Sequence, residues 1–389
     1  MIPLAVPDLT GNENRYLQAC ISSNFVSSVG PFVSRFEADV ALASGNLSGV
    51  ATSSGTAGLH AALVAVGVGM GDLVILPSLT FIASANAIRY CGADPWLLDV
   101  DRDSWNLDPR QLAQALSRET EQSKGGLIHQ PTGRRIAAIM PVHTLGMPAD
   151  MDRIVPLARE YNLPIVADGA AALGAMDKNR PVGALGADLT VFSFNGNKTL
   201  TCGGGGVVVG DDPALMGLVK HLTTTARCGA GYDHDRVGFN YRMTNVQAAI
   251  GCAQLERLSA LVAAKQRIRA DYNRAFADIP GLTPFPGRTE VDPGGEGSLS
   301  GCWFSGVLMA SADQERVWGV LDHLHQAGIE ARPFWKPIHL QKPYLKAPKK
   351  RLPVCESLWF RVVVLPCSVG LSAKEQKRTI NGVLQALSH

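Results

Sequence analysis

Short apolar runs alternate with amphipathic stretches through the first two thirds of the chain. The apolar runs have the length of buried strands, and they lie at 73–77, 95–100, 135–143, 163–169, 188–194 and 207–209. Helical spacing of apolar residues occupies 80–92 and 151–161 between them. Buried strands separated by helices predict a largely parallel sheet with helices on both faces.

The pattern changes near Thr244. Residues 244–279 keep helical spacing, which predicts one long helix capped by Thr244 or Asn245. Two strand patterns and a helix follow, as expected for a smaller α+β domain, at 303–310, 313–327 and 361–366. We therefore predict a large domain over 1–243. The linking helix and the small C-terminal domain would occupy 244–389.

Composition narrows the class of protein. A chain of 389 residues is long enough for about two domains. The formal net charge of +2 gives no electrostatic footprint for nucleic acid. The eight cysteines form no CxxC pair, so we expect neither a metal site nor a disulfide framework. Without a signal-peptide pattern at the start, and without about 18 consecutive apolar residues for a membrane span, the expected location is the cytoplasm.

Polar residues follow several of the predicted strands directly. His143, Asp168 and Lys198 each lie just beyond a strand's carboxyl end, which is where open α/β sheets bind ligands. Residues 53–56, "SSGT", begin an apolar helix. Free N–H groups and the helix dipole make such an end a candidate anion site. An ordinary Ser/Thr cap is the commoner explanation for that stretch alone.

Each of these residues also has an ordinary explanation. Lys198 lies in a turn between two buried strands, where most lysines are solvated surface charges. Asp168 can cap a helix or pair with a buried cation, and Phe81 can pack in the core or offer a flat stacking surface. Together, however, they supply an anion cradle, a carboxylate, an aromatic plate and a lysine. Pyridoxal 5′-phosphate (PLP) is the cofactor that needs all four.

Several motifs then resemble one family, the DegT/DnrJ/EryC1 sugar aminotransferases. They occur in the family's order as "SSGTAGLHAAL", "LPSLTFIASANAI", "PVHTLGMPADMDRI", "VADGAAALGA", "SFNGNKTLTCGGGG" and "VGFNYRMTNVQAAIGCAQLERL". The resemblance is specific and covers nearly the whole chain. The opening stretch, residues 2–30, looks most like the legionaminic-acid-pathway (LegC-like) branch of nucleotide-sugar 4-aminotransferases.

This resemblance implies a fold and a set of residue roles. The fold is the aspartate-aminotransferase-like PLP fold type I, with a large α/β domain and a small C-terminal α+β domain. Lys198 would form a Schiff base with the cofactor and later move a proton, and Asp168 would pair with the ring nitrogen. The other expected cofactor contacts are Ser54, Gly55, Thr56, Phe81, Ser193 and Asn240.

The resemblance also implies substrate contacts and an assembly. Asn240, together with Arg242, would reach the cofactor phosphate from a second subunit of a homodimer with shared active sites. Arg242 and His339 would also lie on the substrate side. One departure is Ala171, where many relatives carry His, Gln or Ser near the cofactor's ring hydroxyl.

The implied reaction is a two-stage transamination. Glutamate would give its amino group to the cofactor and leave as 2-oxoglutarate. A nucleotide-linked 4-keto-6-deoxy sugar, expected to be UDP-linked, would then take the amine for surface-glycan synthesis. Two rival functions stay open: a PLP-dependent keto-sugar dehydratase, and a non-enzymatic binding protein on the same fold. Dehydratases of this kind replace the lysine by histidine, so Lys198 argues against the first.

Overall fold

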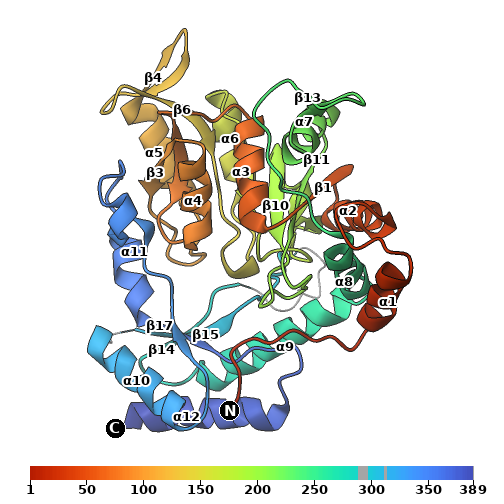
Figure 1. Cartoon of the computed structure of the whole chain (residues 1–389). Helices are drawn as coiled ribbons and strands as arrows, with labels where there is room; N and C mark the ends of the chain where they lie inside the picture. The colour runs from red at the N-terminus through yellow and green to blue at the C-terminus, as the bar shows by residue number, and fades with distance from the viewer. Residues whose placement is uncertain (288–296, 311–312, 389) are drawn as a thin grey trace.

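The structure is a computed structural model, and it describes residues 1–287, 297–310 and 313–388. A large sheet flanked by helices forms the upper part of the molecule in Figure 1, and a smaller sheet with its own helices forms the lower part. Both chain ends lie at the smaller part. In the described ranges, no helix is long and apolar enough to cross a membrane.

The large sheet is built from strands far apart in the sequence. Its strands, in spatial order, are β1 (Ser48–Thr52), β11 (Gly206–Gly210), β10 (Leu189–Ser193), β7 (Val166–Asp168), β6 (Arg134–Ile139), β2 (Leu73–Pro77) and β3 (Asp94–Leu98). Parallel bridges from Ile139 to Ile165 and from Val142 to Asp168 join β6 to β7. An antiparallel hairpin extends β6 at its start, formed by β4 (Thr120–Ser123) and β5 (Gly126–His129).

The predicted α/β sheet is confirmed, with one reversal at β11. This strand pairs antiparallel with both β1 and β10, whereas β10 with β7 and β2 with its neighbours β3 and β6 are parallel. The reason is the connection: residues 194–205 return directly to the neighbouring position without a crossover helix. A parallel connection needs a crossover, usually a helix, that carries the chain back past the sheet. This short connection carries Lys198.

Alternating strand residues face two helical layers, as the sequence predicted. Ile75 and Val207 pack in one core, and their neighbours Val74 and Val208 pack in the other. The first core includes residues from α2 (Pro31–Ser44), α5 (Pro109–Glu119), α6 (Met151–Glu160) and α8 (Asn245–Leu255). The second includes residues from α3 (Gly55–Ala65), α4 (Ile82–Tyr90) and α7 (Pro213–Thr223).

The single long helix predicted over 244–279 is wrong. Thr244 does cap α8, through a capping box with Gln247. The helix ends at Leu255, however, and α9 (Leu258–Phe276) follows after a break. At the break, Glu256 accepts hydrogen bonds from Asn12 and Arg35, and Arg257 donates to Asp8 at 2.9 Å. These contacts with the N-terminal segment, which includes α1 (Glu13–Ser22), hold the break and leave no trace in helical periodicity.

A second hydrophobic core lies under the smaller sheet. That sheet has the order β14 (Leu282–Pro284), β15 (Ser305–Met309), β17 (Val362–Leu365) and β16 (Arg332–Pro333), and its helices are α9, α10 (Gln314–Gln326), α11 (Pro353–Leu358) and α12 (Ala373–Ser388). Ile2 and Leu4 also pack in this core, and the Ile2 N–H donates to the Gly328 carbonyl at 2.8 Å. The start of the chain therefore packs with its end, while the domain boundary at 243/244 stays a prediction.

Two short hairpins complete the described elements. They are formed by β8 (Met176–Asp177) with β9 (Arg180–Pro181), and by β12 (Arg227–Cys228) with β13 (Asp233–His234). The second hairpin leads into residues 238–243, which run back to the main sheet. Thr52 forms an isolated antiparallel bridge with Arg242, and the Ser53 N–H donates to the Tyr241 carbonyl at 2.7 Å.

Candidate active site

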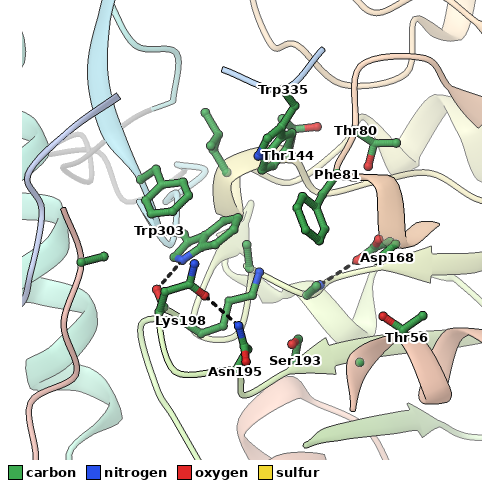
Figure 2. Close-up of a pocket in the computed structure, with 18 of the residues that line it drawn as sticks. Thr56, Thr80, Phe81, Thr144, Asp168, Ser193, Asn195, Lys198, Trp303 and Trp335 are labelled. Atoms are coloured by element: carbon green, nitrogen blue, oxygen red, sulfur yellow. Dashed lines mark hydrogen bonds between the residues drawn. The ribbon is translucent and has the colours of Figure 1, made fainter. Parts of the chain in front are cut away.

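A cavity of about 530 Å³ lies where the large sheet meets the smaller part of the molecule. This volume is in the range of small-molecule and cofactor sites. Both halves of the chain line it, and its wall includes Ser54, Gly55, Thr56, Thr80, Phe81, Thr144, Asp168, Ala171, Ser193, Asn195, Lys198, Trp303, Arg332 and Trp335. Figure 2 shows side chains of this set pointing into one space from different elements.

The start of α3 forms one wall of the cavity. Ser54 caps the helix, because its hydroxyl accepts a hydrogen bond from the Ala57 N–H at 3.0 Å. Gly55 lies so close to β10 that an added Cβ would be 2.7 Å from the Cβ of Ser193. A glycine is therefore needed for this close approach. The helix end, with Thr56 in its first turn, faces the cavity and offers N–H groups and a positive dipole end to an anion.

Asp168 lies at the carboxyl end of β7 and is 6% exposed. One carboxylate oxygen accepts a hydrogen bond from the Ser84 hydroxyl at 2.6 Å, and the other accepts from the Ala170 N–H at 3.0 Å. Parallel pairing of β10 with β7 keeps this strand end at the same rim as Lys198. The carboxylate is therefore held in one orientation at the cavity wall.

Lys198 lies in the connection that reverses the chain between β10 and β11. Its backbone N–H donates to the Asn195 carbonyl at 3.0 Å, so the turn that the sequence predicted is present. Burial lowers the pKa of Lys198 to about 7, while the nearby charge of Asp168 opposes this shift. A large fraction of the amine is therefore neutral near pH 7 and able to act as a nucleophile.

Aromatic side chains form the remaining walls. Phe81 is 52% exposed and lies 5.9 Å from Trp335, measured between ring centroids. The ring centroid of Trp303 lies 3.3 Å from Nζ of Lys198. Trp303 and Trp335 come from the C-terminal part of the chain, so that part closes the cavity over the strand ends (Figure 2).

The structure gathers most of the predicted site residues, but three lie outside the cavity. Seven of the named residues line it together: Ser54, Gly55, Thr56, Phe81, Asp168, Ser193 and Lys198. Asn240 is exposed and Arg242 is half-buried, and neither lines this chain's cavity. His339 is 2% exposed, and its Nδ1 lies 2.7 Å from the Ser78 hydroxyl. His339 therefore joins the C-terminal part to the end of β2, and its substrate role stays a prediction.

Sequence reasoning missed other residues of the site. Ser84 follows Phe81 by three positions at the start of α4, so helical spacing was a usable signal for it. Trp303 and Thr144 carry no local signal that marks them. Thr144 is 2% exposed, and no hydrogen-bond partner for its hydroxyl lies among the described residues. It lines the same cavity as Ala171, which departs from the family pattern.

These residues fit PLP. The α3 end and Ser193 can hold a phosphate, Asp168 can face a ring nitrogen, Phe81 can cover the ring, and Lys198 can attack the aldehyde. Thr144 lines the cavity, and its buried hydroxyl has no hydrogen-bond partner within residues 1–287, 297–310 and 313–388. A bound polar ligand would satisfy it.

A second group of potential ligands lies away from this cavity. His221, Cys228 and Asp235 each offer one potential ligand atom, and these three atoms lie within 4.8 Å of one another. Nε2 of His221 is already 2.6 Å from a carboxylate oxygen of Asp235, as expected for an ordinary ion pair. The prediction that the protein carries no metal stays untested.

The cavity combines a lysine of lowered pKa, a fixed carboxylate and the start of a helix at the strand ends of this sheet. This combination defines an aminotransferase of PLP fold type I. The chain belongs to the DegT/DnrJ/EryC1/StrS aminotransferase family, whose model matches residues 7–384. The predicted class, a PLP-dependent sugar aminotransferase, is thereby confirmed.

Individual relatives match over nearly the whole chain. GDP-perosamine synthase of Caulobacter vibrioides is 37% identical over 395 residues, which cover 99% of this chain and 98% of that protein. GDP-perosamine synthase of Escherichia coli O157:H7 is 35% identical over 380 residues, covering 96% and 95%. The crystal structure of S. venezuelae DesV, in complex with a ketimine intermediate, aligns with a TM-score of 0.84 at 30% identity and covers 99% of each chain.

Proposed function

We propose that this aminotransferase moves an amino group from glutamate to a GDP-linked 4-keto-6-deoxy sugar. One observation carries this proposal: Lys198, Asp168 and the N-terminal start of α3 line the same cavity. The relatives named GDP-perosamine synthase favour GDP over the UDP expected from the sequence. Placement in the legionaminic-acid branch stays a prediction. Arg332 also lines the cavity, where it pairs with the carboxylate of Glu330 at 2.7 Å. Its remaining N–H groups can donate to a diphosphate.

The roles of the residues follow from their surroundings. Bound PLP supplies an aldehyde that accepts an amine and a ring that withdraws electrons. Asp168, fixed by Ser84 and Ala170, presents a negative charge that keeps a ring nitrogen protonated. Nζ of Lys198, with a pKa of about 7, can take a proton from the glutamate Cα and would deliver it to the cofactor carbon that carried the aldehyde. The second stage runs the same proton transfers in reverse on the sugar.

We also propose that the active enzyme is a homodimer with shared sites. Asn240 and Arg242 lie outside their own cavity, and Asn240 is exposed, so a neighbouring subunit is where they can act. Segment 25–29 exposes three apolar side chains, Phe25, Val26 and Val29. The first residue of α8, Asn245, fixes this segment by donating to the Phe25 and Ser27 carbonyls. Exposed apolar groups on a segment tied to Asn245, five residues along the chain from Asn240, are typical of an interface.

A panel of substrates tests the function. Purified protein loaded with PLP would be mixed with glutamate and, separately, with GDP- and UDP-linked 4-keto-6-deoxy hexoses. We expect 2-oxoglutarate and a GDP-amino sugar by mass spectrometry, with Lys198→Ala as the inactive control. Amination of the UDP substrate alone would overturn the GDP assignment. Loss of water from the sugar without an amino product would favour the dehydratase, and no reaction with glutamate would favour the binding protein.

A further inference from the structure

Trp303 lies against the reactive amine and is held there firmly. The exposed fraction of its side chain is 5%. Its indole N–H donates to the carbonyl of Asn197 at 2.7 Å, so it is tied to the residue that precedes Lys198. Its backbone N–H donates to the Leu145 carbonyl at 3.1 Å, and its own carbonyl accepts from Nζ of Lys265 at 3.0 Å. The backbone contacts fix the position from which the indole projects, and turning the indole away would break its hydrogen bond to Asn197.

The ring face is the part that meets Lys198. The distance of 3.3 Å between Nζ and the ring centroid places the amine directly over the aromatic surface (Figure 2). The indole face is the best aromatic partner for an ammonium group. Phe304 stacks behind it with the ring centroids 4.1 Å apart, which keeps that face toward the lysine.

The indole face of Trp303 can stabilise the amine of Lys198 when the lysine is not bonded to the cofactor. During transamination Lys198 leaves the cofactor and must stay close, in a cavity where burial disfavours its cation. Asp168 is the charged group in the described structure that acts on it electrostatically, and in our proposal that carboxylate serves the ring nitrogen. An aromatic face can hold an ammonium without adding a second charge.

We propose that Trp303 is a positioning residue that holds the side-chain amine of Lys198 whenever the lysine is not bonded to the cofactor. This inference rests on the proposed function, in which Lys198 alternates between a bonded and a free state. Trp303 gives the free lysine a fixed resting place near the reacting atoms, through its π face rather than through its volume.

The test measures the basicity of Lys198 in cofactor-free protein. The extent of acetylation of the Lys198 peptide is followed by mass spectrometry across pH. Trp303→Leu keeps an apolar side chain without an aromatic face, and Trp303→Phe keeps a face without the N–H. We expect Trp303→Leu to lower the pKa of Lys198 by about one unit, which corresponds to about 1.4 kcal/mol, and Trp303→Phe to keep most of the original value.

Controls separate this effect from packing. Trp335→Leu removes another tryptophan of the cavity wall and should leave the pKa of Lys198 unchanged. If Trp303→Leu does not fold, Trp303→Met replaces it as the apolar variant. An unchanged pKa in the apolar variant, or an equal drop in Trp303→Phe, would overturn the proposal. Failure of the wild-type protein to react with glutamate would instead reject the proposed function, because acetylation needs neither cofactor nor substrate.

Discussion

Lys198 lies in a turn that follows β10, and its surroundings set its chemistry. A solvated lysine is protonated at neutral pH, whereas burial lowers the pKa of this one to about 7. The sequence predicted the turn and the lysine, because an apolar strand leads directly into the polar residues "NGNK". It could not predict Trp303, which is 105 positions away along the chain and meets Lys198 only through the fold.

Replacing Lys198 with alanine removes both the attachment point and the proton carrier. We expect turnover to fall by at least about 10²–10⁴-fold, the usual contribution of a general base. Cofactor should still bind through the α3 end, but it should wash out during dialysis. Borohydride reduction followed by mass spectrometry checks the linkage. A cofactor that stays covalently attached to the variant would show that another residue carries it.

The shifted pKa of Lys198 also predicts how stability depends on pH. In cofactor-free protein the folded state releases this proton near pH 7, whereas the unfolded chain keeps it to about 10.5. Between these values the unfolded state binds more protons, so the free energy of unfolding should rise with pH. Lys198→Met lacks this term and is the reference. Urea unfolding at several pH values should show the variant's advantage shrinking from pH 7 to pH 10; a constant difference would contradict the shift.

Asp168→Asn keeps the shape of the side chain and removes its charge. We expect turnover to fall on the order of 10²-fold, the size typical of losing one preorganised electrostatic contact. Cofactor affinity should change far less, because the phosphate contacts remain. Ser84→Ala removes one hydrogen bond to the carboxylate and should cause a smaller loss. Measuring kcat and the cofactor dissociation constant for each variant shows whether turnover falls more than affinity. Unchanged turnover in Asp168→Asn would require another acid at the ring.

At the scale of elements, strand ends and helix starts were predictable because their signals are local. Apolar runs marked β7 and β10, and "SSGT" marked the start of α3. The antiparallel direction of β11 follows from the connection 194–205, which contains no crossover helix. The apolar pattern alone predicted a strand there but not its direction. The break between α8 and α9 was not predictable, since Asn12, Arg35 and Asp8 hold it from distant positions.

The close contact between α3 and β10 gives an element-scale prediction. In Gly55→Ala the new Cβ would lie 2.7 Å from the Cβ of Ser193, so the helix start must shift away from the sheet. We expect a loss of cofactor affinity and of thermal stability. Gly217→Ala is the matched control, because it lies on the exposed surface of α7 with no atom near its added Cβ, and it should stabilise by about 0.5–1 kcal/mol. Equal melting temperatures for the two variants would contradict this account.

At the scale of the whole molecule, the cavity exists only because the two ends of the chain meet the large sheet. Trp303, Arg332 and Trp335 come from the C-terminal part, and Leu4 comes from the first residues. His339 fixes this arrangement by its contact with Ser78. Periodicity indicated that a small second domain exists, but it could not show which of its faces would cover the strand ends. That choice depends on packing between distant segments, so Trp303 and Trp335 were missed, whereas Phe81 was predicted.

The position of Asn240 leads to a prediction about assembly of the whole molecule. Asn240 is exposed and lies outside its own cavity. In a two-fold dimer each site would combine Lys198 from one subunit with Asn240 from the other. Lys198→Ala and Asn240→Ala homodimers should then both lose activity. In a mixed dimer, one site would collect both defects and the other would collect neither.

Mixing the two inactive chains therefore tests the shared site directly. About half of the active sites in each mixed dimer should recover, because a two-fold arrangement gives each dimer two equivalent sites. Differently tagged chains, purified through both tags after subunit exchange, provide the mixed dimer, and a mixture of two Lys198→Ala preparations is the control that should stay inactive. No recovery after confirmed exchange would place Asn240 in its own subunit's site or outside any site. A monomer at assay concentration would rule out the shared site, because no second subunit would then be present to supply Asn240.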